Sequence, residues 1–432
     1  MRRGVKRRIM DYKSYSRKEL EEMLADERKR FKKLAKSGKP VDMTRGRPSK
    51  AQLEIAMPML KEAGGYDYSA EDVDARNYGA LGGTRACKNL FAELFGVRPE
   101  EVFVGDGSSL DLMYTLVHFA KQFGVLGGTP WNNLKKVKFI CPAPGYDRHF
   151  SICQQFGIEM ITVRMLDDGP DMDVVESLVR EDDTIKGIWC VPKYSNPTGI
   201  IFSDRVVERL ATMQTAAEDF RIFWDNAYMV HGLYGNDDVL KNIFDVARKA
   251  GTINRIYSFA STSKITFAGS GVSAIAASEE NIKSIAKLMF FKCINANKVN
   301  QIMHANFLKN AAGVKKVMAQ HAELLRPKFE LFDRKFTEAF ADDGYVVWSR
   351  PRGGYFISVD VKGCAKRIVE LAAEAGVKFT EAGATFPYKL DDMDSNIRVA
   401  PSVPSLEEME FAADVMISAI RQARMEKVLS KI

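Results

Sequence analysis

No run of this sequence approaches the roughly 18 apolar residues that a membrane-spanning helix needs. The basic opening MRRGVKRR is followed by Asp11 and Tyr12, where a secretory signal would continue with an apolar segment. The six cysteines are scattered and form no CxxC pair, and several lie in apolar stretches, where cysteine behaves as a small hydrophobe. We therefore expect a cytoplasmic protein with reduced thiols, without a metal and without a membrane.

Charge is not concentrated enough to indicate a nucleic-acid partner. The net charge is +7 over 432 residues, and much of it lies in MRRGVKRR and in the run from Arg28 to Lys36. Basic runs can contact nucleic acid, but a solvated tail or helix face is the commoner reason for them, so we expect no such partner. Met10 is a candidate for the natural start, with residues 1–9 as an extension.

The chain is long enough for two domains and shows no internal repeat or low-complexity linker. Ser16 and Glu19 form a capping box that begins a helix over residues 16–37, and a long helical pattern covers 297–340. Short apolar runs alternate with helical segments from about residue 85. The strand candidates are Val102–Val104, Lys138–Cys141, Met160–Val163, Ile185–Val191, Arg221–Trp224, Arg255–Phe259 and Val272–Ala276, then Val346–Trp348, Tyr355–Val361 and Ile397–Val399.

Continuous apolar strands separated by helices predict a mainly parallel sheet that is covered on both faces. We expect an α/β fold with a large domain at residues 61–320, built on a mainly parallel seven-stranded sheet between helices. A smaller α+β domain is expected at 321–432. Residues 1–60 are expected to form an N-terminal arm and helix and part of the small domain.

Five consecutive strands of the predicted sheet end in polar clusters: VFVGDGSS, FICPAPGY, IWCVPKYSNPTG, IFWDNAY and YSFASTSK. Ligands of open α/β sheets bind beyond the carboxyl ends of the strands. The clusters therefore predict one shared site.

Three of these clusters carry complementary chemistry, and each also has a plain structural explanation. GDGSS opens a helix and is either a phosphate cradle or an ordinary N-cap. Asp225 follows an apolar strand and either needs a cation or donor partner or caps the next helix. Lys264 is either an amine nucleophile or a surface lysine. Pyridoxal phosphate (PLP) requires a lysine, an anion cradle and an acid, so one cofactor makes all three coherent.

Four motifs in register carry a resemblance to a known family. NPTG at 196–199, DNAY at 225–228, STSK at 261–264 and NIRVAPS at 396–402 resemble the class I aminotransferases of PLP fold type I. The resemblance runs from about Thr44 to the C-terminus. Three segments are most similar in sequence to a divergent bacterial branch of aspartate aminotransferases: CPAPGYDRH, VPKYSNPTG and STSKITFAG.

The resemblance implies a role for each matching residue. Lys264 would hold PLP and move the proton between the amino acid and the cofactor, and Asp225 would pair with the ring nitrogen. Asn196 and Tyr228 would bond the 3′ oxygen, and Tyr146 would stack on the ring unless it simply packs the core. The implied phosphate contacts are Ser108, Ser109, Ser261, Ser263 and, in the neighbouring subunit, Tyr78.

The substrate side follows from the same resemblance. Arg398 matches the arginine that grips the α-carboxylate, a task that suits its two-pronged donor geometry. Asn196 lies beside this site in the family, and Gly46 would let the chain approach the carboxylate closely. Lys298 is a candidate for the cation that crosses a two-fold interface to the distal carboxylate of the substrate, although a lysine at a solvated helix start has the same pattern.

The sequence departs from the family at one position. The family carries an arginine eight residues after the lysine, where it pairs with the phosphate, and this chain has Val272 there. The sequence does not identify the group that balances the phosphate charge in place of this arginine.

We therefore expect an aminotransferase that moves the amino group of a dicarboxylic amino acid, L-aspartate, to a 2-oxo acid, 2-oxoglutarate. Its partners would be these small molecules and a second copy, in a homodimer with composite active sites. A lyase or decarboxylase on the same fold is one alternative. A PLP-binding regulator is another, but the roughly 40 residues before the resemblance are too few for a DNA-binding domain.

Overall fold

The computed structural model describes residues 11–38, 40–69, 71, 73–235 and 238–432, so the prediction for residues 1–9 lies outside it. An eight-stranded sheet forms the larger unit, in the order β2-β9-β8-β7-β6-β3-β4-β5. The neighbouring strands β8, β7, β6, β3 and β4 run parallel to one another. The pairs β2–β9, β9–β8 and β4–β5 are antiparallel. The strands are β2 (Val102–Gly105), β3 (Lys138–Ala143), β4 (Glu159–Leu166), β5 (Gly169–Pro170), β6 (Ile185–Cys190), β7 (Arg221–Asp225), β8 (Ile256–Ser261) and β9 (Ser273–Ala276).

The α/β fold with a mainly parallel sheet is thus confirmed, but the expected seven strands are eight. The additional strand, β5, has two residues and turns back on the end of β4. Two residues are too few to show an apolar pattern, which is why the sequence did not predict it.

Side chains of successive strand residues enter two separate cores. In β7, Ile222 and Trp224 pack on one face of the sheet and Phe223 on the other. The first face is covered by α4 (Arg85–Phe95), α7 (Met172–Glu181), α8 (Asp204–Thr212) and α9 (Ile243–Ala250), and the second by α5 (Ser109–Phe123), α6 (Asp147–Gln155) and α10 (Glu279–Lys292). Burial on both faces explains why the strands read as continuous apolar runs.

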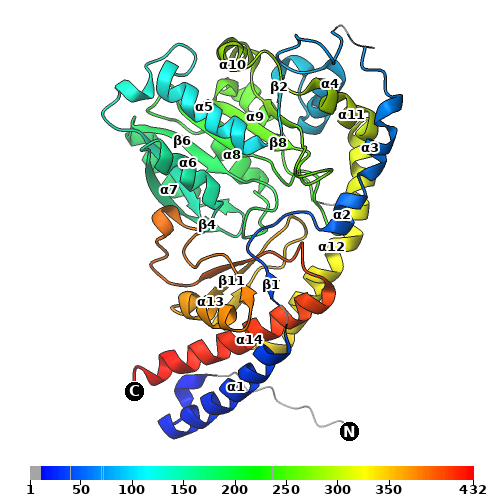
Figure 1. Cartoon of the computed structure of the whole chain (residues 1–432). Coiled ribbons are helices and arrows are strands. Elements are labelled where there is room, and N and C mark those ends of the chain that lie inside the picture. Colours follow the sequence, from blue (N-terminus) through cyan, green and yellow to red (C-terminus); the bar gives the residue numbers. More distant parts are fainter. Residues whose placement is uncertain (1–10, 39, 70, 72, 236–237) are drawn as a thin grey trace.

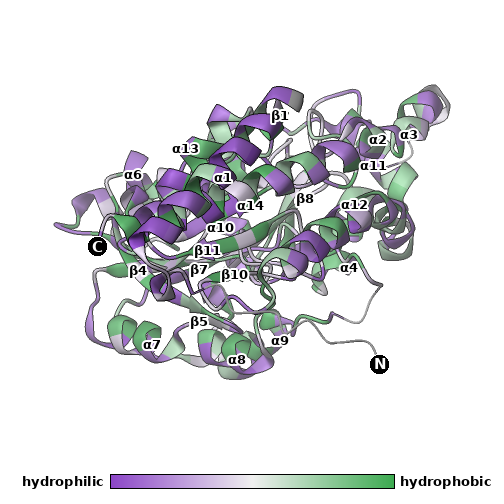
Figure 2. Cartoon of the chain, turned by 90° about the horizontal axis from the view of Figure 1, so that it is seen from below, coloured by the Kyte–Doolittle hydropathy of each residue, from purple (hydrophilic) through white to green (hydrophobic). Residues whose placement is uncertain are grey.

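The smaller unit joins both ends of the chain. It contains an antiparallel sheet of β10 (Val346–Trp348), β11 (Ile357–Val361) and β13 (Asn396–Val399), together with the pair β1 (Val41–Asp42) and β12 (Val377–Lys378). Its helices are α1 (Arg17–Ser37), α13 (Ala365–Glu374) and α14 (Leu406–Leu429), and α1 lies along α14 (Figure 1). Most of α1 is hydrophilic in the view from below (Figure 2). Capping boxes begin α1 at Ser16, as predicted, and α14 at Ser405. The domain boundaries stay a prediction.

The long helical pattern over 297–340 is two helices and not one. α11 (Lys298–Leu308) ends at Lys309, whose φ of 64° is left-handed, and α12 (Ala311–Phe340) begins after Asn310, whose side chain accepts a hydrogen bond from Gly313. The break contains neither glycine nor proline, so it carries no strong sequence signal. α12 runs down one side of the molecule past both units (Figure 1). The remaining short helices are α2 (Lys50–Glu54) and α3 (Met57–Glu62) and the 3-10 turns Tyr12–Ser14, Ala63–Gly65, Pro99–Glu101, Trp131–Asn133, Ile253–Arg255 and Pro387–Lys389.

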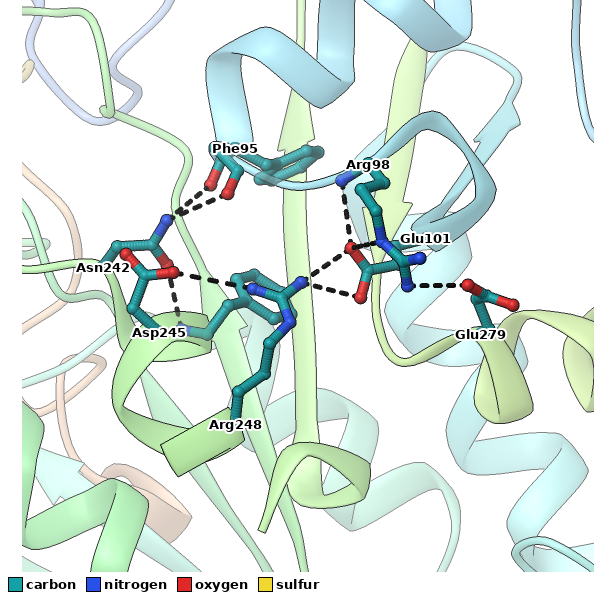
Figure 3. A network of polar contacts seen from close by, with 9 residues as sticks. Phe95, Arg98, Glu101, Asn242, Asp245, Arg248 and Glu279 are labelled. Atoms are coloured by element: carbon teal, nitrogen blue, oxygen red, sulfur yellow. Dashed lines mark hydrogen bonds and ion pairs between the residues drawn. The ribbon is translucent and has the colours of Figure 1, made fainter. Parts of the chain in front are cut away.

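An ion-pair network braces the β2 edge of the sheet (Figure 3). Arg248 on α9 donates to both carboxylate oxygens of the buried Glu101 at 2.7 and 2.6 Å. Arg98 contacts the same carboxylate and also pairs with Glu279 at the start of α10. Burial alone would raise the pKa of Glu101, but the hydrogen bonds from Arg248 and Arg98 lower it. Among the described residues, no helix is long and apolar enough to cross a membrane.

Candidate active site

A cavity of about 800 Å³ opens at the carboxyl ends of the parallel strands. The larger unit contributes the loops after β3, β6, β7 and β8 and the start of α5, and the smaller unit contributes β13 and the loop after β1. All but two of the predicted site residues line this cavity: Gly46, Ser108, Ser109, Tyr146, Asn196, Asp225, Tyr228, Ser261, Ser263, Lys264 and Arg398. Tyr78 and Lys298 do not.

Asp225 ends β7 and is 2% exposed. Its Oδ2 lies 3.0 Å from Nε2 of His149, whose ring stacks on Trp189 with centroids 4.4 Å apart. Its Oδ1 is buried and has no hydrogen-bond partner among the residues that the structure describes. A buried carboxylate oxygen without a donor costs free energy, so this atom calls for a donor from a bound molecule. The protonated ring nitrogen of PLP has the chemistry that Oδ1 lacks, and in this respect the site fits the cofactor.

Lys264 lies after β8, with its Nζ 5.1 Å from the centroid of the Tyr228 ring. Burial lowers the pKa of Lys264, and the charge of Asp225 opposes that shift without cancelling it. Behind the lysine, Tyr355 donates to the Lys264 carbonyl at 3.5 Å, and Gln52 donates to Tyr355 at 2.9 Å. An amine held rigidly with a lowered pKa is easier to deprotonate and hence a better nucleophile.

Serine hydroxyls and a helix N-terminus gather at the α5 end of the cavity. Ser108 caps α5 and accepts a hydrogen bond from Leu110 N at 3.2 Å, and Ser263 donates to the Gly107 carbonyl at 2.7 Å. Gly271 packs so close to this loop that a Cβ there would lie 2.4 Å from Ser263 Oγ. Val272, in the place of the family's arginine, is 1% exposed and packs in a hydrophobic core.

Arg398 on β13 is 6% exposed and its guanidinium is already engaged. Nη1 lies 2.6 Å from Asp147 Oδ1 and 3.5 Å from Asn196 Oδ1, and Nη2 donates to Thr380 Oγ1 at 3.1 Å. The guanidinium carbon lies 4.9 Å from the ring centroid of Phe356. The same ring explains Gly46, because a Cβ at this position would lie 2.6 Å from Phe356 Cζ.

Tyr78 and Lys298 lie outside the cavity lining, and Lys298 contacts the loop that carries Tyr78. Tyr78 is 74% exposed. Lys298 is 2% exposed, and its Nζ donates to the carbonyls of Asn77 at 2.5 Å and Gly79 at 2.7 Å, on either side of Tyr78. Lys298 is therefore not a solvated lysine at the start of a helix. The roles of both residues toward a partner subunit stay predictions.

Several residues in the cavity lining or in contact with it escaped the sequence reasoning. His149 follows Tyr146 by three residues in the first turn of α6, and this helical spacing was the only signal for it. Asp147 and Thr380 contact Arg398 across 251 and 18 residues of sequence, a relation that no local pattern encodes. Arg45, Arg47 and Arg148 also line the cavity.

Comparisons with known proteins agree with this geometry. The aspartate amino-transferase family matches residues 15–431. An aspartate aminotransferase from Corynebacterium glutamicum is 44% identical over 404 residues, which cover 93% of each chain. The crystal structure of an aspartate transaminase from C. glutamicum superposes with a TM-score of 0.93 at 42% identity, covering 96% of this chain and 99% of that one. At 19% identity, an alpha-aminoadipate aminotransferase from Thermus thermophilus, complexed with N-(5′-phosphopyridoxyl)-L-leucine, shares the fold with a TM-score of 0.70 and covers 98% and 97% of the two chains.

The sheet, the second unit and the lysine-centred cavity between them define an α/β enzyme of PLP fold type I. The chain belongs to the aspartate aminotransferase family. It is an aminotransferase, and aminotransferases of this type use PLP.

Proposed function

We propose that this enzyme transfers the amino group of L-aspartate to 2-oxoglutarate and that it uses PLP bound at Lys264. The observation that carries the proposal is the unpartnered Oδ1 of Asp225, buried in the same cavity as Lys264 and Arg398. An acid, an amine and a carboxylate-binding arginine are the three groups that an amino-acid substrate and a pyridine cofactor require together.

When bound, PLP supplies an electron sink for the carbanion at the substrate Cα. Lys264 would bind the cofactor and carry the proton that leaves and returns at Cα, and Asp225, oriented by His149, would keep the ring nitrogen protonated. Asn196 and Tyr228 would hydrogen-bond the 3′ oxygen, with Tyr146 stacked on the ring. The N-terminus of α5 and four serine hydroxyls would bind the phosphate, and these neutral donors would replace the absent arginine. The serines are Ser108, Ser109, Ser261 and Ser263.

A dicarboxylic substrate is supported by the cations of the cavity. Arg45 and Arg148 line it and make no ion pair or hydrogen bond with any residue that the structure describes. A guanidinium without a partner in a ligand cavity suits a second carboxylate. The name of the C. glutamicum relative points to the same substrate class. Lys298 stays a candidate for the distal cation from a partner subunit, although carbonyls of its own chain already take its ammonium.

The proposal includes a homodimer. Phe290 and Phe291 at the end of α10 are 69% and 81% exposed, and Ile294 after this helix is 62% exposed. Exposed apolar groups of this kind mark interfaces. Tyr78, on the loop held by Lys298, is likewise exposed. A two-fold interface is self-complementary, so one crossing of Tyr78 would complete two sites.

The test is the absorbance change of the bound cofactor when the holoenzyme is mixed with each of the twenty amino acids. Aspartate and glutamate are expected to react fastest. Three matched variants, Arg45→Gln, Arg148→Gln and Lys298→Met, then separate the three candidate cations. The variant that lacks the distal cation should lose dicarboxylic substrates and keep alanine. A holoenzyme that reacts with no dicarboxylic amino acid would refute the substrate assignment.

A further inference from the structure

The substrate-binding arginine of the proposed function is paired with a carboxylate of its own chain. Asp147 Oδ1 lies 2.6 Å from Arg398 Nη1, and this is the one ion pair of Arg398 among the described residues. The inference below rests on the proposed function, because it concerns how Arg398 receives the α-carboxylate.

The geometry leaves no pair of N–H groups on the guanidinium free. Nη1 serves Asp147 and, at 3.5 Å, Asn196, while Nη2 serves Thr380 at 3.1 Å and the Thr44 carbonyl at 3.4 Å. Nε is buried and has no partner in the described part of the chain. A carboxylate that binds through two parallel N–H groups must therefore displace an existing contact. Displacing Asp147 also removes the repulsion between two carboxylates on one guanidinium.

The position of Asp147 allows its carboxylate to leave the guanidinium of Arg398. Its side chain is 32% exposed against 6% for Arg398, so its carboxylate reaches solvent by a small rotation while the arginine stays buried. Its carboxylate makes no other hydrogen bond among the described residues, and it stands in the first turn of α6, where the helix dipole favours a negative charge. While no ligand is bound, the same carboxylate compensates a buried guanidinium that would otherwise be unpaired.

We propose that Asp147 is an internal substitute for the substrate α-carboxylate: it holds Arg398 in the empty site and is displaced by each ligand that carries this group. Asp147 is thus a positioning residue that competes with the substrate. A partly exposed ion pair changes an equilibrium constant by a factor of roughly two to ten. Because a ligand must break the pair of Asp147 and Arg398, we expect it to bind more weakly, by about this factor, than it would if Asp147 did not compete.

The test is the dissociation constant of succinate, an unreactive dicarboxylate, for the holoenzyme by titration calorimetry. Asp147→Asn is expected to bind succinate about two- to tenfold more tightly than the wild type. Asp147→Ser is a second charge-free variant and should act in the same direction. Cofactor content and thermal midpoint are measured for each protein, so that a folding defect is not mistaken for a binding effect.

Glu381→Gln is the matched control. Glu381 lines the same cavity but pairs with Lys389 at 2.7 Å and not with Arg398. Its removal should tighten succinate binding less than Asp147→Asn does. Unchanged or weaker binding in both Asp147 variants, or an equal gain in the control, would overturn the proposal. If the wild type turns over aspartate while these results fail, only this inference falls; if the wild type does not turn over aspartate, the proposed function itself falls.

Discussion

Replacing Asp225 by asparagine removes one charge from the centre of the site and leaves the shape unchanged. The carboxylate is 2% exposed, one oxygen faces His149 and the other has no donor. Two unit charges about 4 Å apart attract by about 4 kcal/mol at an effective dielectric constant of about 20. Only the part of this energy that grows toward the transition state lowers the barrier. We therefore expect kcat to fall by a factor of about 30 to about 1,000.

The assay is kcat for aspartate with 2-oxoglutarate, read beside the absorbance spectrum of the bound cofactor. Asp225→Asn and Asp225→Ala should both bind PLP and both lose most activity, and Asp225→Glu should retain more if charge is what matters. The control is Asp219→Asn, just before the other end of β7, where the carboxylate pairs with Lys186 at 2.7 Å and accepts from Trp131 at 2.7 Å. This variant should lose stability, because it weakens a part-buried ion pair, and keep kcat. Equal kcat in wild type and Asp225→Ala would refute the role of the charge.

Lys264→Ala should fold and lose turnover, and borohydride reduction followed by peptide mapping should place a pyridoxyl label on Lys264; a label on another lysine would reject the assignment. In the cofactor-free protein, burial lowers the pKa of Lys264, so the unfolded chain binds this proton more tightly than the native one. Lys264→Met should therefore be more stable than wild type toward urea near pH 7, and the gain should vanish as the pH rises through the ordinary lysine pKa of about 10.4. Arg398→Lys should weaken the binding of all amino acids alike, since an ammonium cannot reproduce two parallel hydrogen bonds; a loss confined to dicarboxylic substrates would move Arg398 to the distal pocket. Mixing inactive Lys264→Ala subunits with inactive Tyr78→Phe/Lys298→Ala subunits should restore part of the activity, and subunit exchange without recovery would mean that each chain builds its site alone.

Periodicity and strand-end chemistry predicted most of the large unit, because both are local properties. The apolar runs predicted at 221–224 and 255–259 became β7 and β8, and the polar residues after them met in one cavity. Strand direction is not local, so the reversed course of β9, which is antiparallel to both β2 and β8, could not be read from its apolar residues. The two-residue strand β5 and the break at Lys309 were missed because each depends on tertiary contacts.

The site shows the same division between local and distant information. Lys264 and Asp225 stand in motifs, so their type and position were visible in the sequence. Their partners are not in motifs. His149 reaches Asp225 across 76 residues, and Asp147 reaches Arg398 across 251. Such pairs follow from the packing of α6 against the end of the sheet, and only the folded chain brings them together.

Lys298 shows that an alignment without a motif can locate a residue without defining what that residue does. A lysine ammonium has three N–H donors, and two of those of Lys298 go to the carbonyls of Asn77 and Gly79. With 2% of the residue exposed, little of it is left for a ligand from another chain. Its contacts instead fix the loop that presents Tyr78 to the outside. If Lys298 acts in this way, Lys298→Met and Tyr78→Phe should both weaken cofactor binding, and Lys298→Met should affect aspartate and alanine equally. A loss confined to aspartate would show that the ammonium reaches the distal carboxylate itself.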